Sequence, residues 1–516
     1  MVNFTELTTP PNHGDVLVMP SPREWASSAR ANGTALRRAD RVLAGSTLSD
    51  WRRRTREAIV GSDDALVIVL GHQPDFIHPG VWAKHIVAAR AAEAVDGIAL
   101  DLIVDSDSVK RSHLAIPSLK GERVTVEPVR FADVAPGFAY EQIERQTPER
   151  IARFARLTRD AMGSAYAGSQ MPRFLDALAS RVDARDWVDQ YVGARQAIEA
   201  GFGIAIQERR ISELWCSPLV LDMLQHACEF ATAYNRALAS YRVANGIRGT
   251  HRPMPDLVRD DVRCELPLWA HDPQGVRRRL FVAEEGSSLR LLAGQREIGV
   301  LDGRCLHSCQ DLEAAFAELG GWQLRPRALA LTIWARLLLA DLFVHGIGGA
   351  KYDRISDAIM ADYYGLTPPR MACVSATLHM DIPPGTATAE TVRRCRHAVR
   401  DVQWNPQRHV SAGHSAEALI EQRAEAIRRA QSLRHHAPRD RLGRRNAFND
   451  IRRASAGLLD LSPNLLAARK ADLDRAIAEN EQRKIARGRE SFFGLYDTNR
   501  LVQLLDALPA TRAFRV

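Results

Sequence analysis

Residues 66–107 read LVIVLGHQPDFIHPGVWAKHIVAARAAEAVDGIALDLIVDSD. This stretch begins with an apolar run at residues 66–70 and ends with a second at residues 99–104, and a helical pattern lies between them. Two short apolar runs separated by one helix predict a βαβ unit. Neither run alternates with polar residues, so we expect both strands to be buried on both faces of a parallel sheet.

Polar residues follow each predicted strand. The carboxyl ends of parallel strands meet at one edge of a sheet, and in open α/β sheets that edge is where ligands bind. We therefore expect the polar residues that follow the two strands to line one crevice. The catalytic candidates are His72, Asp105 and Asp107, and the substrate- or anion-binding candidates from this unit are Gly71, Gln73, His78 and Lys84.

A third crevice loop is predicted at residues 343–353, FVHGIGGAKYD, where a short strand enters a glycine-rich turn before a new helix. Backbone amides at such a turn suit a phosphate or a carboxylate. Glycines there permit close approach or positive φ. The pattern is not a Walker A motif, and a purely structural tight turn is the alternative. The candidates from this loop are Gly346, Gly348, Gly349, Lys351 and Asp353.

The candidate residues each have a second interpretation. His72 titrates near neutrality and suits acid–base chemistry or phosphate contact, or it is a structural histidine. Asp105 and Asp107 suit orientation of an amine or a hydroxyl, or Mg²⁺ binding, or helix capping. Lys84 and Lys351 suit neutralisation of a carboxylate or phosphate, or are solvated surface side chains. No dedicated metal site is predicted.

Composition limits the class of protein. The 516 residues suffice for two to four domains, and the hydrophobic fraction of 46% is that of an ordinary globular chain. No apolar run approaches the roughly 20 residues of a membrane helix. The first 19 residues lack a secretory signal pattern. Seven scattered cysteines predict reduced thiols without a disulfide framework, and hence a cytoplasmic location.

The chain divides into six predicted segments. A helical arm (1–60) precedes the first half of the core (61–135), an inserted helical and small antiparallel β region (136–324), the second half of the core (325–411), a helical coiled-coil hairpin (412–490) and a tail (491–516). The arginines of the arm, such as Arg52, are expected on a solvated face. Residues 411–490 carry 17 Lys and Arg against 11 Asp and Glu, an excess of six positive charges.

A family resemblance rests on these motifs. Gly71-His72-Gln73-Pro74, then His78-Pro79-Gly80 and a helix with Lys84, resembles the opening motif of the cysteine-adding enzymes of bacillithiol biosynthesis. The acidic strand end Asp105-x-Asp107 and the turn at residues 346–349 are similar to further motifs of that family, and the C-terminal hairpin to its coiled-coil domain. Ser106 stands where the family has a histidine. The resemblance implies a Rossmann-like core with inserted connecting peptides, as in a nucleotidyltransferase-like ligase.

The expected fold is therefore α/β, with a Rossmann-like parallel sheet, helical and small β insertions and a C-terminal antiparallel helical hairpin. The expected function is a ligase- or transferase-like enzyme that joins a small amine- or thiol-bearing substrate to an anionic metabolite. The alternatives are a catalytically silent binding or assembly protein of the same fold and an RNA-associated protein using the basic hairpin. The cofactor is undetermined, with ATP and Mg²⁺ as candidates. A homodimer is expected, without membrane or nucleic-acid partners.

Overall fold

The computed structural model describes residues 4–121, 123–134, 137–214, 218–411 and 413–515. The chain forms two compact units. The first comprises Met1–Ile116, Glu127–His379 and Arg489–Val516, and the second Pro117–Val126 and Met380–Gly488. The segment boundaries predicted at residues 135–136 and 412 lie outside the described residues.

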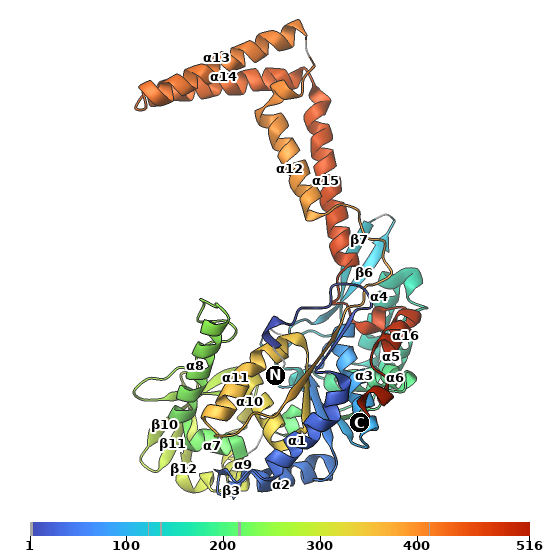
Figure 1. Cartoon of the computed structure of the whole chain (residues 1–516), viewed down its shortest axis with the longest axis vertical. Helices are drawn as coiled ribbons and strands as arrows, with labels where there is room; N and C mark the ends of the chain where they lie inside the picture. Colours follow the sequence, from blue (N-terminus) through green and yellow to red (C-terminus); the bar gives the residue numbers. More distant parts are fainter. Residues whose placement is uncertain (1–3, 122, 135–136, 215–217, 412, 516) are drawn as a thin grey trace. The chain divides into compact units, whose positions relative to one another are not determined.

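A six-stranded sheet forms the centre of the first unit (Figure 1). Its order is β1 (Val16–Met19), β15 (Met371–Ala376), β14 (Leu342–His345), β4 (Val67–His72), β5 (Ile98–Ile103) and β8 (Gln207–Arg210). The strands from β15 to β8 run parallel, and β1 pairs antiparallel with β15. All six residues of β15 and the first four of β4 are buried, which explains why, apart from Ser375, these residues are apolar.

The predicted βαβ unit is confirmed as β4, α3 (Pro79–Ala94) and β5, with the two strands paired in parallel. From β4 the chain adds β5 and β8 on one side, and later β14 and β15 on the other, so the strand order reverses between β4 and β14. Gly71, Asp105 and Gly346 consequently lie at the same, carboxyl edge of the sheet, as predicted. The chain is thus a mixed α/β protein with a mostly parallel sheet.

The N-terminal helices α1 (Trp25–Arg37) and α2 (Leu48–Val60) pack within the first unit through charged as well as apolar side chains. Arg52 and Arg56 of α2 donate hydrogen bonds to Asp341 at 2.7 and 3.1 Å, and all three side chains are fully buried. Burial lowers the pKa of Arg52 to about 10, against the opposing effect of Asp341. The prediction of a solvated face is therefore wrong for Arg52, because its counter-charge lies far along the sequence.

A five-stranded antiparallel sheet confirms the small β region expected within the insertion. Its order is β12 (Arg296–Asp302), β11 (Ser288–Ala293), β10 (Arg277–Glu285), β9 (Cys264–His271) and β13 (Gln323–Pro326). Leu280, Val282 and Leu291 are buried on its inner face. Helix α8 (Ala227–Ala244) packs against β9, so this sheet shares the large core of the first unit.

Two cysteines of this region form a disulfide. Cys228 at the start of α8 is bonded to Cys264 at the start of β9. The prediction of reduced thiols without a disulfide is wrong for this pair. The sequence could not pair them, because 36 residues separate the two positions and only the packing of α8 on β9 brings them together.

The second unit is helical, with α12 (Ala389–Trp404), α13 (His414–His436), α14 (Arg441–Asp460) and α15 (Pro463–Ala486). The single hairpin predicted over 412–490 is not confirmed. Instead α13 packs along α14, and α15 packs along α12 (Figure 1). Gly457 allows α14 to approach α13 closely, because a Cβ there would lie 3.2 Å from Leu419. Gly385, just before α12, similarly lies against the backbone of Glu479.

Among the described residues, no helix has both the length and the apolar character needed to cross a membrane.

Candidate functional site

The end of β4 places an imidazole and an ammonium group close together. Nζ of Lys84, from α3, donates a hydrogen bond to the carbonyl oxygen of Gly71 at 3.0 Å. Nδ1 of His72 lies 2.9 Å from the carbonyl oxygen of Gln73, which can only accept, so the hydrogen is on Nδ1. Burial first, and then the charge of Lys84, lower the pKa of His72 well below its usual value. His72 is therefore neutral at pH 7, with its free electron pair on Nε2.

Asp105 follows β5 and is fully buried. Its carboxylate accepts hydrogen bonds from Nε of Arg210 at 2.6 Å, from the backbone N–H of Ser212 at 2.9 Å and from the Ser212 hydroxyl at 2.5 Å. Burial raises the pKa of Asp105, although Arg210 opposes the shift. Both oxygens are thus engaged, which favours the structural interpretation of Asp105 over a catalytic one.

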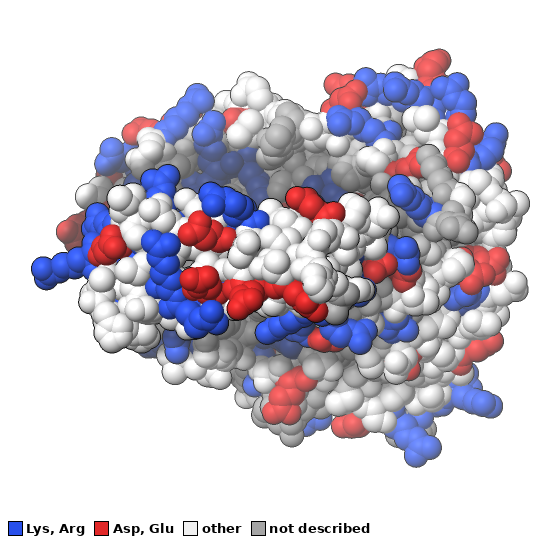
Figure 2. Space-filling model, turned by 90° about the horizontal axis from the view of Figure 1, so that it is seen from above, with Lys and Arg blue, Asp and Glu red and all other residues white. Residues whose placement is uncertain are grey.

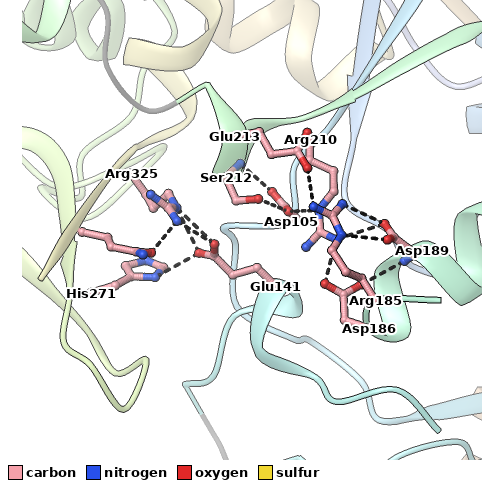
Figure 3. Close-up of polar contacts among 11 residues, drawn as sticks. Asp105, Glu141, Arg185, Asp186, Asp189, Arg210, Ser212, Glu213, His271 and Arg325 are labelled. Carbon is pink, nitrogen blue, oxygen red and sulfur yellow. Dashed lines mark hydrogen bonds and ion pairs between the residues drawn. The ribbon is translucent and has the colours of Figure 1, made fainter. Parts of the chain in front are cut away.

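Arg210 extends this network to the start of helix α6 (Trp187–Gly201). Its Nη1 donates to Asp186 at 2.7 Å and to Asp189 at 3.0 Å, and Arg185 bonds the same Asp189 (Figure 3). One guanidinium group therefore ties the ends of β5 and β8 to α6. This network fixes the geometry of the carboxyl edge on the β8 side.

Asp107 lies two residues further and is more accessible, with a side chain 31% exposed. It accepts hydrogen bonds from Nε2 of Gln73 at 2.8 Å and from Nη1 of Arg277 at 2.7 Å. Burial alone would raise the pKa of Asp107, but the hydrogen bonds from Gln73 and Arg277 outweigh it and lower the pKa. The expectation that the ends of β4 and β5 face one another holds for Gln73 and Asp107.

A second charged cluster lies where the five-stranded sheet meets this edge. Glu141 accepts a hydrogen bond from Nη2 of Arg325 at 2.8 Å, and Nδ1 of His271 lies 3.2 Å from it (Figure 3). Burial opposes the ionisation of Glu141, but the contacts with His271 and Arg325 are stronger and lower its pKa. Arg277 and Arg327 both stack over Trp269 on β9. The β insertion thus supplies cations to the edge of the main sheet.

The glycine-rich segment is the start of helix α11 (Ile347–Asp362), and no separate turn precedes it. Gly346 is the N-cap with φ −81°, and Gly348 and Gly349 are not among the positive-φ residues. The expectation of positive φ is therefore wrong. A Cβ at Gly346 or Gly348 would meet nothing within 4 Å, whereas one at Gly349 would lie 2.7 Å from Nδ1 of His345. Close approach is required at Gly349 alone.

The remaining candidates occupy different positions. Asp353 is buried and bonded to Arg336 at 2.6 Å and to His345 at 2.8 Å, which leaves no role in direct anion contact. Lys351 is partly exposed on α11. His78 is the N-cap of α3, and its Nδ1 accepts a hydrogen bond from the Gly80 N–H at 3.1 Å. Burial lowers the pKa of His78 to about 4, although Glu490 opposes this shift.

Mg²⁺ does not fit the two aspartates predicted for it. Both oxygens of Asp105 accept bonds from Arg210 and Ser212, and Asp107 is paired with Arg277. A cation there would have to displace guanidinium groups. Within the described residues, no cluster of three or more His, Cys, Asp or Glu side chains has metal-binding geometry.

Sequence reasoning missed the cationic and histidine partners of this edge. These residues are Arg210, Arg277, Arg325, His271 and His345. Only the three consecutive arginines at residues 277–279 offered a local signal. The others reach the edge from elements whose positions depend on the whole fold.

The fold and this edge define a mixed α/β protein whose polar side chains gather at the carboxyl ends of parallel strands. No family model matches the sequence, and no curated protein matches it either.

Proposed function

We propose that this protein is a ligase- or transferase-like enzyme with a Rossmann-like core, which joins a small amine- or thiol-bearing substrate to an anionic metabolite. The observation that carries the proposal is the convergence of His72, Asp107 and the start of α11 on one edge of the parallel strands, beside the point where the strand order reverses. Ligands of open α/β sheets bind at such a point.

The anionic group is assigned to the start of α11. The first helical backbone hydrogen bond runs from the Ala350 N–H to the Gly346 carbonyl, so the N–H groups of residues 347–349 have no acceptor within the helix. Gly348 and Gly349 are exposed. Open amides at the positive end of a helix favour a phosphate or carboxylate. ATP is the candidate nucleotide, and the nearby Lys351 adds positive charge.

The amine or thiol is assigned to the β4 and β5 ends. Asp107 is ionised and partly accessible, so it can orient a substrate ammonium group. His72 is neutral, with Nε2 available to accept a hydrogen bond from the substrate. Acids and bases gathered at one edge of the sheet suit acid–base work on a polar substrate. The resemblance to cysteine addition in low-molecular-weight thiol biosynthesis agrees with such a substrate pair.

The catalytically silent alternative rests on a specific observation. Asp105 and Asp353 are each paired with a buried arginine, as in a structural scaffold. The RNA-associated alternative draws on the basic excess of the second unit. Figure 2 shows basic and acidic side chains intermixed on the face it displays, and Arg453 and Arg469 pair with Asp450 and Asp472 in that unit. Intermixed charge does not favour a phosphate backbone.

The proposal also covers the oligomeric state and the cellular location. A homodimer through residues 412–489 is proposed, because α14 exposes Leu442 and Phe448. The cytoplasmic location stays a prediction, and the Cys228–Cys264 disulfide does not favour it, because disulfides are rare in that compartment.

The test of the proposed function is metabolite profiling of a strain that lacks the gene. Both unjoined substrates should accumulate, and the wild-type gene should restore the joined product. A His72→Ala gene should fail to restore it, although the purified variant still binds ATP in calorimetry with and without Mg²⁺. An unchanged metabolite profile in the deletion strain would favour the silent alternative.

A further inference from the structure

His345 ends β14 directly in front of α11 and is 9% exposed. Its Nε2 lies 2.8 Å from Oδ2 of Asp353, and Nη1 of Arg336 lies 2.6 Å from the same oxygen. Burial opposes ionisation of Asp353, but the charge of Arg336 and the hydrogen bond with His345 prevail and lower its pKa strongly. A carboxylate can only accept a hydrogen bond, so the imidazole hydrogen is on Nε2. In the neutral form of His345, the free electron pair is therefore on Nδ1.

Nδ1 of His345 faces the first turn of α11. A Cβ built on Gly349 would lie 2.7 Å from Nδ1, which shows how closely the ring edge approaches this residue. Within the described part of the chain, no hydrogen bond to Nδ1 is formed. The open N–H groups of residues 347–349 occupy the same turn. Among the described residues, Nδ1 of this mostly buried side chain, whose Nε2 is bonded to Asp353, thus lies next to three N–H groups that have no acceptor.

We propose that His345 is the proton acceptor of the reaction, with Asp353 as its positioning residue; this inference rests on the proposed function. The anionic metabolite binds the amides of α11, and the amine or thiol of the second substrate gives its proton to Nδ1. The N–H or S–H bond breaks, a new N–H bond forms on the imidazole, and the electron pair stays on the substrate atom as the nucleophile. Asp353 stabilises the imidazolium, which later releases its proton to water.

The pairing of a base with a carboxylate that orients it is the arrangement that activates nucleophiles in many enzymes. His72 lacks it, because its Nδ1–H is directed to a neutral carbonyl, and burial and Lys84 weaken it as a base. His345 has a counter-charge ready for the proton that it accepts. The geometry therefore favours His345 over His72 for proton transfer.

The experiment is nitrogen NMR of the imidazole rings in the full chain, with inorganic phosphate as the probe and His345→Gln to assign the signal. Free His345 should show hydrogen on Nε2 and none on Nδ1. Phosphate should shift the amide signals of Gly348 and Gly349 and the Nδ1 signal of His345. Gly349→Ala should displace the ring and abolish the Nδ1 response, whereas the control Gly249→Ala, outside the site, should retain it, because its methyl group meets open space.

Unfolding of α11 would not explain a lost Nδ1 response in Gly349→Ala, because alanine favours a helix over glycine by about 1 kcal/mol. The catalytic readout is the deletion strain, in which a His345→Gln gene should leave the joined product absent and a Gly249→Ala gene should restore it. Two results would overturn the role of His345: hydrogen on Nδ1 in the free protein, or restoration of the joined product by the His345→Gln gene. In either case, amide signals that shift with phosphate would still support the anion site. Amide signals that do not respond to phosphate overturn the anion site of the proposed function itself.

Discussion

Gln73 donates a hydrogen bond to Asp107 at 2.8 Å across 34 positions of sequence. The contact joins the loop after β4 to the loop after β5, and Arg277 closes it from the five-stranded sheet. Asp105, two residues earlier, is buried in a separate network with Arg210. Two acids of one short motif therefore have different environments and should respond differently to substitution.

Asp105→Asn should destabilise the protein far more than Asp107→Asn. The first change leaves the buried Arg210 without its main counter-charge, which costs about 3–5 kcal/mol. The second weakens a partly exposed ion pair, worth about 0–1 kcal/mol. Urea unfolding of both variants measures the difference. Equal and small losses of unfolding free energy would show that the buried network does not hold the edge together.

Lys84→Met should raise the pKa of His72. The positive charge of Lys84 is the second cause, after burial, of the lowered pKa of this imidazole, and methionine keeps the length of the side chain without the charge. Titration of the His72 ring by NMR measures the shift, with the exposed His307 as an internal control. A His72 pKa that stays the same in the variant would place Lys84 too far from the ring to matter.

Glu208→Gln should raise the free energy of unfolding above that of the wild type, and the gain should be larger at pH 8 than at pH 5. Burial raises the pKa of Glu208 to about 7, Arg195 opposes this shift, and Asp101 and Glu199 add to it. The folded state therefore binds more protons than the unfolded state between about pH 4.5 and 7, so this group's contribution to stability falls as pH rises through that window.

Glutamine resembles the protonated acid and lacks that penalty. The relative gain between the two pH values should be on the order of 3 kcal/mol. Urea unfolding at pH 5 and pH 8 measures it, and Glu213→Gln, at a more exposed position, serves as the matched control. A gain that is equal at both pH values would mean that Glu208 is already ionised at pH 5.

Reduction of the Cys228–Cys264 disulfide should lower the free energy of unfolding by about 2–4 kcal/mol. Thiol counting under denaturing conditions should find two more thiols after treatment with dithiothreitol than before. The double variant Cys228→Ser, Cys264→Ser should match the reduced wild type and should not respond to reductant. Equal thiol counts before and after treatment would contradict the bond.

Leu442→Glu with Phe448→Glu should convert a dimer to a monomer. These side chains on α14 are 70% and 48% exposed, and charge at the centre of an interface prevents close packing. Mass photometry of the intact chain and of the variant measures the state. Val243→Glu, exposed on α8 of the first unit, is the control and should leave the dimer intact. An intact chain that is monomeric at micromolar concentration contradicts the dimer.

Local sequence patterns sufficed for elements whose signal lies within a few neighbouring residues. The apolar runs of β4 and β5, the helix between them and the small antiparallel sheet all follow from the spacing of apolar side chains. The helical character of the second unit follows in the same way. The pairing of these helices does not follow from local patterns, because several amphipathic helices can pair in more than one way. Small contacts such as that of Gly457 with Leu419 decide which helices pair.

By itself, the sequence determined the mixed α/β class and the shared edge of Gly71, Asp105 and Gly346, since parallel strands must end on the same side. Only the tertiary structure decided which polar groups are available there. Arg210 and Arg277 reach Asp105 and Asp107 from distant segments, and a buried charge is stable only with such a partner. Pairing across long loops depends on the packing of the whole chain, which no local pattern records.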